Sequence, residues 1–293
     1  MATLISLKRR IQAAQNVSKT TKAMQMIAAS KLKKAQEAAL STRPYVQKLS
    51  ELTKQALSNK PESFTHPYLT QNKTGKELLI LLSPDKGLCG GLVTNLLKEF
   101  LSYQKNHTET NYVLVGKKAE MQISKLGSDV IANFHFGTSQ PAFDMVYPLA
   151  KLIEEYYLSG QVDSVKVLYT KFNNIFTQKP EIQQLLPLQI DIADESSSVE
   201  ASVDKQETMV FEPSVATLLP SLLTHYVEMS LYQFILESFV SEQGARMISM
   251  QNATNNANDI ISELRLEYNK TRQAKITSEI LDITGAAVAL ASE

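Results

Sequence analysis

The chain has 293 residues and no net charge, because 30 Lys and Arg residues balance 30 Asp and Glu residues. Its total charge therefore says nothing about partners. A single cysteine, Cys89, excludes an internal disulfide and a CxxC redox pair, and suits a reducing compartment. The most apolar window, 222–240, contains His225, Glu228 and Glu237, which argues against a membrane span.

The charges are unevenly distributed along the chain. Residues 1–58 carry eleven Lys or Arg against Glu37 and Glu51, whereas Asp191 to Glu212 holds seven acids against Lys205. The basic segment has two interpretations that the sequence leaves open. It is either a solvated face of a helix or a surface for an acidic partner or a nucleic acid.

The first 58 residues have the pattern of one long helix, expected from about Ala2 to Leu57, with a kink or a joint at Pro44. Small and apolar residues recur at alternating spacings of three and four, which is the seam of a coiled coil. The seam consists of Leu4, Leu7, Ile11, Ala14, Ser18, Thr21, Gln25, Ala28, Leu32, Ala35, Ala39 and Thr42.

The middle of the chain, 74–192, reads as a central α/β domain of Rossmann-like type. Strands are expected at 77–83, 112–116, 130–136, 164–172 and 185–192, and helices at 92–104, 117–126 and 141–158. Strands that alternate with helices predict an open, mainly parallel sheet with helices on both faces.

An acidic, serine-rich connector is expected at 193–212, followed by a C-terminal helix within 213–293 whose first residue would be Pro220. From Pro220 to Gly285 no second proline occurs and the only other glycine is Gly244. Such a helix would be about 98 Å long. A 293-residue ball would be only about 50 Å across.

This helix has its own seam, which fits the one at the N-terminus. The seam runs through Met247, Met250, Thr254, Ala257, Ile261, Leu264 and Tyr268, and then shifts phase through Arg272 to Ile276, Ile280, Ile283, Ala287 and Leu290. Because both terminal helices would start from the same body, the fold class is α/β plus a long antiparallel coiled coil made by the two ends of the chain.

Catalytic chemistry is sparse in this sequence. The loop Ser83 to Gly91 (SPDKGLCGG) follows a strand and precedes a helix, where backbone N–H groups can hold phosphate, but its spacing matches neither GxGxxG nor GxxxxGK[ST]. A packed turn is the alternative, with Cys89 as a small buried side chain. The four histidines are scattered, so no catalytic, cofactor or metal residue is predicted.

Three segments resemble the gamma subunit of rotary, F-type ATP synthases in its bacterial form. They are Ser6 to Leu32 (SLKRRIQAAQNVSKTTKAMQMIAASKL), Ser83 to Asn95 (SPDKGLCGGLVTN) and Ser241 to Leu290, which contains GARM and NKTRQAKIT. The resemblance implies the central-stalk rotor subunit of a proton-translocating ATP synthase, which transmits torque and is not itself catalytic. Its implied partners are the alpha and beta subunits of the catalytic hexamer, the epsilon subunit and the membrane c-ring. It implies no cofactor and no nucleic acid, and membrane contact only through other subunits.

The resemblance also implies a set of interface residues. Met24 and Arg246 match segments that couple rotation to catalysis, and Arg272 and Gln273 match shaft residues that hydrogen-bond the catalytic subunit. Thr277 and Ile280 lie in the helix end that turns in an apolar sleeve. The basic residues Lys8, Arg9, Arg10, Lys19, Lys22, Lys31, Lys33 and Lys34 are expected to face acidic segments of the catalytic subunits.

The sequence shows no apolar signal segment after Met1 and no transit peptide, and it lacks the cysteine pair inserted in the plastid form. We therefore expect a peripheral protein at the cytoplasmic face of the bacterial inner membrane. The sequence leaves the driving ion open, proton or sodium. Two other functions compete with the rotor: a nucleotide-using enzyme with the Ser83 to Gly91 loop as its phosphate site, and a nucleic-acid binder with a basic arm.

Overall fold

The computed structural model describes residues 3–59, 61, 64–72, 74–107, 109–127, 129–188, 211–212 and 214–291, with side chains up to 284. Most of the predicted acidic connector, 193–210, thus lies outside the described residues. Contacts divide the chain into two compact units, each described by itself below. Residues 1–29 and 246–293 form the coiled-coil unit, and residues 30–245 form the sheet unit.

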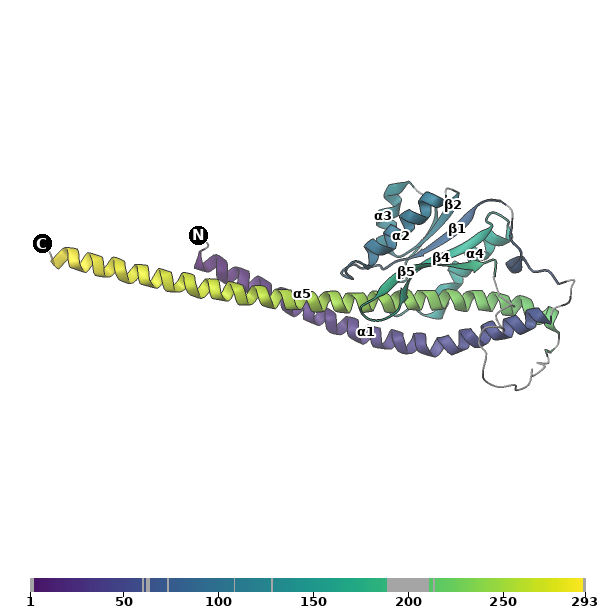
Figure 1. Ribbon diagram of the computed structural model, residues 1–293, viewed down its shortest axis with the longest axis horizontal. Helices are drawn as coiled ribbons and strands as arrows, with labels where there is room; N and C mark the ends of the chain where they lie inside the picture. The colour runs from purple at the N-terminus through teal and green to yellow at the C-terminus, as the bar shows by residue number, and fades with distance from the viewer. Residues whose placement is uncertain are drawn as a thin grey trace, which may run out of the picture. The chain divides into compact units, whose positions relative to one another are not determined.

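The sheet unit contains a five-stranded sheet in the order β3-β2-β1-β4-β5 (Figure 1). The strands are β1 (Glu77–Leu82), β2 (Thr110–Val115), β3 (Val130–Phe134), β4 (Ser164–Phe172) and β5 (Gln178–Leu186). β1 pairs in parallel with β2 and β4, β2 pairs in parallel with β3, and β5 runs antiparallel to β4. The predicted mainly parallel sheet is confirmed.

The last strand was predicted in the wrong place, at 185–192. It begins at Gln178, because Asn174 closes a tight turn after β4, where its side chain accepts hydrogen bonds from the N–H groups of Phe176 and Thr177 at 2.9 and 2.7 Å. β5 reads QKPEIQQLL, a polar strand with Pro180 in it, which is tolerated at the edge of a sheet. The alternation of apolar residues that signals a buried strand is therefore missing.

Helices cover both faces of the sheet, as β1 illustrates (Figure 1). Successive side chains of a strand point to opposite faces. Leu79 and Leu81 accordingly join a cluster with α2 (Leu92–Asn106) and α3 (Lys117–Ile123). Leu78, Ile80 and Leu82 join a larger cluster with α4 (Val146–Leu158) and the first part of α5 (Val215–Ala291).

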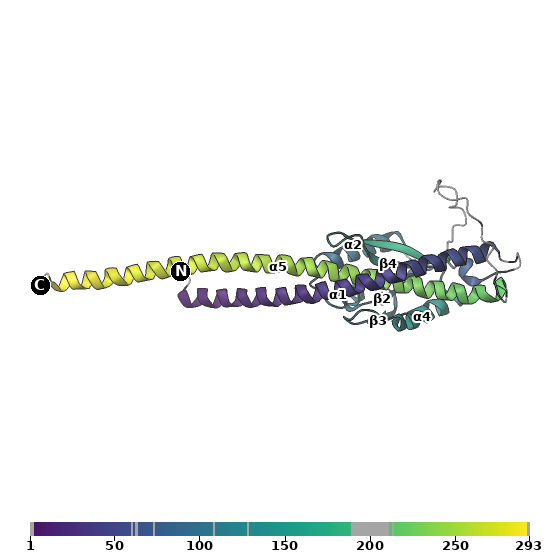
Figure 2. The ribbon, with the colours of Figure 1, turned by 90° about the horizontal axis from the view of Figure 1, so that it is seen from below.

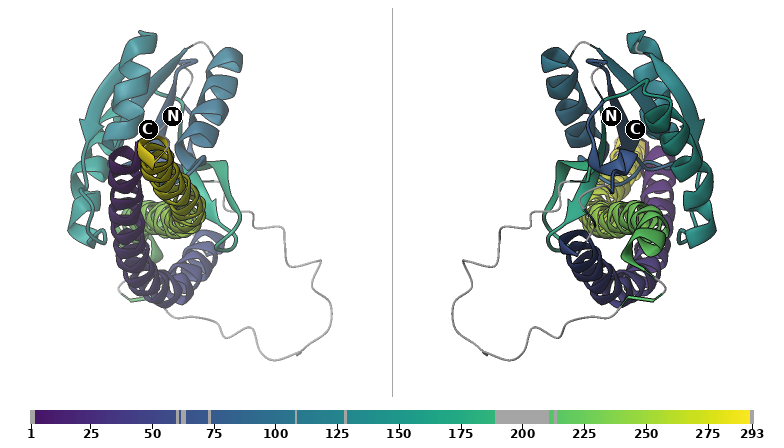
Figure 3. Two further views of the ribbon diagram at one scale, coloured as in Figure 1. Left: turned by 90° about the vertical axis from the view of Figure 1, so that its left-hand side faces the viewer. Right: turned by 90° about the vertical axis from the view of Figure 1, so that its right-hand side faces the viewer.

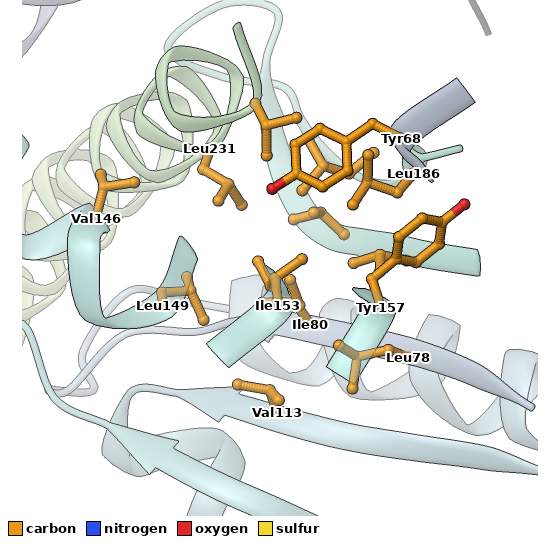
Figure 4. Packing of buried hydrophobic residues seen from close by; sticks show 14 of the residues in the cluster. Tyr68, Leu78, Ile80, Val113, Val146, Leu149, Ile153, Tyr157, Leu186 and Leu231 are labelled. Carbon is orange, nitrogen blue, oxygen red and sulfur yellow. The ribbon is translucent and has the colours of Figure 1, made fainter. Parts of the chain in front are cut away.

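Figure 4 shows part of this larger cluster, with Ile153 of α4 and Leu231 of α5 above the strand residues Ile80 and Val113. Three short 3-10 helices complete the sheet unit: η1 (Pro67–Leu69), η2 (Ser124–Leu126) and η3 (Phe143–Met145). The last two occupy ends of the helices predicted at 117–126 and 141–158, which are shorter than expected. Among the described residues, no helix combines the length and apolarity needed to cross a membrane.

Two long helices pass through both units, α1 (Leu4–Ser58) and α5. With 77 residues, α5 is about 115 Å long. Pro44 lies inside α1, which continues without a break. The prediction that Pro220 begins the last helix is wrong: α5 starts at Val215, because Ser214 caps it by accepting hydrogen bonds from Thr217 through its side chain and its carbonyl.

Candidate functional site

The coiled-coil unit pairs the first turns of α1 with α5 in opposite directions. As residue numbers rise along α1 they fall along α5: Ser18 faces Asn258, Thr21 faces Thr254 and Gln25 faces Gln251. Figures 2 and 3 show the two helices side by side. The predicted antiparallel coiled coil is therefore confirmed.

Those three pairs are hydrogen-bonded rungs across the seam, which we call the polar rungs. The Ser18 hydroxyl donates to Asn258 Oδ1 at 2.7 Å, the hydroxyls of Thr21 and Thr254 are 2.7 Å apart, and the Gln25 amide donates to Gln251 Oε1. Polar groups that pair across a seam fix the register of the two helices. The sequence indicated a seam rich in Ser and Thr, but not which residues pair.

Apolar layers lie at both ends of the polar rungs. Leu7 is fully buried near the start of α1, and Leu264 and Ile261 are nearly so on α5. Beyond the rungs, Ala28 and Met250 are also buried. Because much of the seam is Ala, Ser and Thr, the helices bury little apolar surface per turn, and their outer faces stay exposed.

The predicted interface residues of α1 lie mostly on that outer face. Those with exposed side chains are Lys8, Arg9, Arg10, Lys19, Lys22 and Met24 in the coiled-coil unit, and Lys33 and Lys34 in the sheet unit. Between residues 3 and 29 the chain has five basic residues and no acidic one, whereas residues 246–284 have five of each. The positive charge of this unit is thus concentrated along α1.

Lys31 has a different environment from the other basic residues. It is half-buried, and its ammonium group donates to the backbone carbonyl of Thr138 in the loop after β3. Arg246 on α5 is also half-buried. Within the sheet unit, the contact of Lys31 joins α1 to the loop after β3, a role that sequence periodicity gives no means of finding.

The last described turns of α5 present Arg272, Gln273, Thr277 and Ile280 as exposed side chains. The seam that was predicted to continue here, after its phase shift, is uncovered: Ile276, Ile280 and Ile283 are 47%, 55% and 69% exposed. The reason is that α1 begins at Leu4, and the register of the polar rungs places Leu4 at the level of Arg272 on α5. Within the described residues, this apolar stripe therefore has no covering helix.

The loop Ser83 to Gly91, the candidate phosphate site, is hydrogen-bonded to other parts of the sheet unit. Asp85 accepts hydrogen bonds from the N–H of Lys117 at 3.0 Å and from the N–H of Gly137 at 2.8 Å. Its carboxylate therefore joins the loop to the start of α3 and to the loop after β3. The small cavity beside it has a volume of about 40 Å³, which is room for no more than a few water molecules.

Ser83 and Gly116 close the same edge of the sheet. The Ser83 hydroxyl donates to the carbonyl of Val115 at 3.0 Å and accepts from the N–H of Ala119 at 3.0 Å. Gly116 has φ 97°, and a Cβ atom placed there would lie 2.0 Å from the Ser83 carbonyl oxygen. Cys89 is buried against Leu92 and Ala245. The packed-turn interpretation therefore fits this loop better than a nucleotide site. No cluster of metal-ligating side chains is found among the described residues.

The comparisons with known proteins agree on one family. The family model described as ATP synthase matches residues 3–290. The ATP synthase gamma chain of Dehalococcoides mccartyi (strain CBDB1) is 42% identical over 296 residues, covering 99% of this chain and all of the relative. That of Ralstonia nicotianae is 36% identical over 298 residues, with the same coverage.

A similar solved structure comes from the Euglena gracilis mitochondrial ATP synthase, in an assembly of OSCP, F1 and c-ring. It aligns with a TM-score of 0.65 and 17% identity, covering 98% of this chain and 94% of that one. At this identity the similarity shows the fold alone.

Proposed function

This chain belongs to the ATP synthase gamma family, and on that premise we propose that it is the central-stalk rotor subunit of a proton-translocating, F-type ATP synthase. It is a non-catalytic subunit that transmits torque between the membrane c-ring and the catalytic hexamer. Its partners are the alpha and beta subunits, the epsilon subunit and the c-ring.

The observation that carries the proposal is the unequal surface of the coiled-coil unit. One helix presents five exposed or half-exposed basic side chains without an acidic one, and the other has balanced charge. A shaft of this kind inside a ring of three catalytic subunits touches each of them differently. It therefore favours a different nucleotide affinity in each, and turning it passes that bias from one site to the next.

We assign the interface residues by position. Lys8, Arg9, Arg10, Lys19, Lys22, Lys33 and Lys34 act as a diffuse basic surface toward acidic segments, while Met24 and Arg246 mark the coupling region. Arg272 and Gln273 hydrogen-bond a catalytic subunit. The uncovered stripe with Thr277 and Ile280 turns in an apolar sleeve, which supplies the covering that the chain does not. Lys31 contributes to this interface indirectly, through the hydrogen bond that it donates to the backbone carbonyl of Thr138.

The working parts follow the boundaries inferred from the sequence: helix 1–58 and helix 213–293 as the shaft, 74–192 as the body and 193–212 as a connector. We place the protein at the cytoplasmic face of a bacterial inner membrane, as a peripheral subunit. Both gamma chains reported above at 42% and 36% identity come from bacteria, which supports this location.

A single-molecule rotation assay tests the proposal. A cysteine replaces Lys105 on the exposed side of α2 and is biotinylated to hold a bead, while the catalytic hexamer is fixed to a surface. The native Cys89 is buried, so the unmodified chain is the control that should take up no bead. Added ATP should turn the bead in one direction with three pauses per turn. A bead that stays still while ATP is hydrolysed would refute the rotor.

The role of Met24, whose side chain is 38% exposed, is tested separately. Met24→Lys should lower the number of protons pumped per ATP hydrolysed in membrane vesicles, because a charge enters a largely steric contact, while assembly stays intact. Met24→Leu is the matched control and should pump normally. Pumping that remains proportional to hydrolysis in the lysine variant would remove Met24 from the coupling region.

A further inference from the structure

A second cavity of the sheet unit belongs to none of the surfaces described above. It has a volume of about 330 Å³ and lies between η1, α4 and α5, and we call it the α4–α5 cavity. Ile153 and Val227 give it an apolar floor, and Tyr147, nearly half exposed, stands at its mouth. This volume falls within the range of pockets that bind small ligands or side chains.

Two carboxylates meet in this cavity, Glu154 from α4 and Glu228 from α5. Glu228 lies 3.7 Å from His225, its neighbour on the same helix. Among the ion pairs of the described residues, none includes Glu154. Burial, with help from the negative charges of Glu154 and Glu228, raises the pKa of the Tyr68 hydroxyl to about 12. Both carboxylates line the same small cavity as the apolar side chains of Ile153 and Val227.

A matching ligand has a cationic head and an apolar stem. A lysine or arginine side chain has this form, because its methylene stem packs on apolar surface while the charged head stays with polar groups. The groups that face these carboxylates are the exposed Lys151 at the rim, His225 beside Glu228 and the Tyr68 hydroxyl beside Glu154, so Lys151 is the one lysine or arginine that lines the cavity. An anion is therefore disfavoured by the two carboxylates, and a purely apolar ligand would make no favourable contact with them.

We propose that the α4–α5 cavity is a binding site for an amphipathic cation, and that its occupant is a lysine or arginine side chain of a partner protein. The chain itself offers a poor occupant nearby. Leu188, which donates from its N–H to the carbonyl of Tyr68, leads into the segment from Asp191 to Glu212, where Lys205 is the only base against seven acids. The choice of a protein partner rests on the proposed function, since a rotor subunit works inside an assembly. The binding of a cation by the cavity does not depend on that function.

The first test uses the isolated full-length chain and n-butylammonium as the probe. With methyl-labelled Ile and Val, the signals of Ile153 and Val227 should shift with a Kd of about 1–10 mM, corresponding to roughly 3–4 kcal/mol. The neutral n-butanol should bind at least fivefold more weakly. Equal affinity for the two probes, or no shift of either methyl signal, would refute the cation site.

Two variants and a matched control locate the charge. Glu154→Gln and Glu228→Gln should each weaken n-butylammonium at least fivefold, because each removes half of the negative charge that faces the cavity. Glu155→Gln changes the neighbouring exposed carboxylate on α4, which does not line the cavity, and should bind as the native chain does. Equal weakening in all three variants would show a general charge effect and overturn the assignment.

The occupant is tested in the assembled complex. A cysteine replacing Lys151 at the rim should react with a maleimide at least tenfold more slowly in the complex than in the isolated chain. Unchanged reactivity, with n-butylammonium still bound by the isolated chain, would mean that the cavity takes a free cation and would overturn the partner side chain. A chain that rotates but fails to bind the probe refutes the cavity alone, and one that binds the probe without rotating refutes the rotor alone.

Discussion

The sheet unit and the coiled-coil unit bury their side chains in different ways. In the sheet unit, β1 has apolar residues buried on both of its faces, so Ile80 and Leu81 are both without exposed surface. In the coiled-coil unit, each helix buries one stripe, and three of its layers are the polar rungs. The sheet unit therefore holds most of the folding free energy, while the coiled-coil unit depends on helix continuity and register.

The largest expected effect comes from Gly116 at the edge of the sheet. Gly116→Ala should lower the free energy of unfolding by about 3–5 kcal/mol, because a positive φ is strained for alanine and its Cβ would overlap the Ser83 carbonyl. Gly127→Ala is the control: it also has positive φ but nothing within 4 Å, so about 1–2 kcal/mol is expected. Urea unfolding measures both, and equal losses would contradict the close packing of this edge.

Truncation of one isoleucine in each unit tests the comparison directly. Ile80→Ala should cost about 4 kcal/mol, because it leaves a cavity inside a rigid core, and Ile261→Ala should cost about 2 kcal/mol, because the thin seam can partly collapse. Amide hydrogen exchange should show the second loss only in residues 3–29 and 246–284. An Ile261→Ala variant that loosens the sheet as much as Ile80→Ala would show that the two units unfold as one.

Substitutions at the polar rungs should change the stability of the coiled-coil unit less, and a single and a double variant should change it in opposite directions. Thr254→Val alone should destabilise the coiled-coil unit by about 1 kcal/mol, because the Thr21 hydroxyl loses its partner on α5 and keeps only carbonyls of its own helix. Thr21→Val together with Thr254→Val should restore or slightly raise stability, since both polar groups are replaced by apolar ones of similar shape. Hydrogen exchange in α1 measures both. A double variant less stable than the single one would indicate that the pair contributes more than register.

The smallest expected effect is the pH dependence contributed by Asp163. Burial alone would raise its pKa, but hydrogen bonds from Thr74 and Gly75 outweigh this and hold the pKa below the ordinary value of 3.8. The folded state therefore binds this proton less tightly than the unfolded state. The resulting stability is present above pH 3.8 and is lost as the pH falls through the folded value. Asp163→Asn should flatten the acid limb of the unfolding curve, and an unchanged limb would contradict this assignment.

Several features could be predicted from local patterns because neighbouring residues in the sequence carry them. The 3,4 spacing placed Leu7, Ala28 and Leu32 in the seam, and all three are buried. The apolar run of 77–82 gave the central strand. The basic exposed face of α1 followed from the seam, since residues away from the stripe must face outward.

Other features failed at this level because they depend on groups far apart in the chain. Gln178–Leu186 forms a strand through its pairing with β4, although its composition is polar. Lys31 was predicted, with the other basic residues, to face the catalytic subunits, and its contact with Thr138, 107 positions away, has no signal in the local sequence. The α4–α5 cavity likewise unites residues from three separate elements, and no local pattern indicates it.

The sequence by itself determined that both ends of the chain are helical, that a parallel sheet lies between them and to which family the chain belongs. Periodicity and sequence motifs suffice for this, because they depend on residues that are close together in the sequence. Only the tertiary structure decided which hydroxyls and amides pair across the seam, that Asp85 binds the N–H groups of Lys117 and Gly137, and where the apolar stripe of α5 is no longer covered by α1. Each of these depends on the distance between elements, which packing sets and sequence spacing does not.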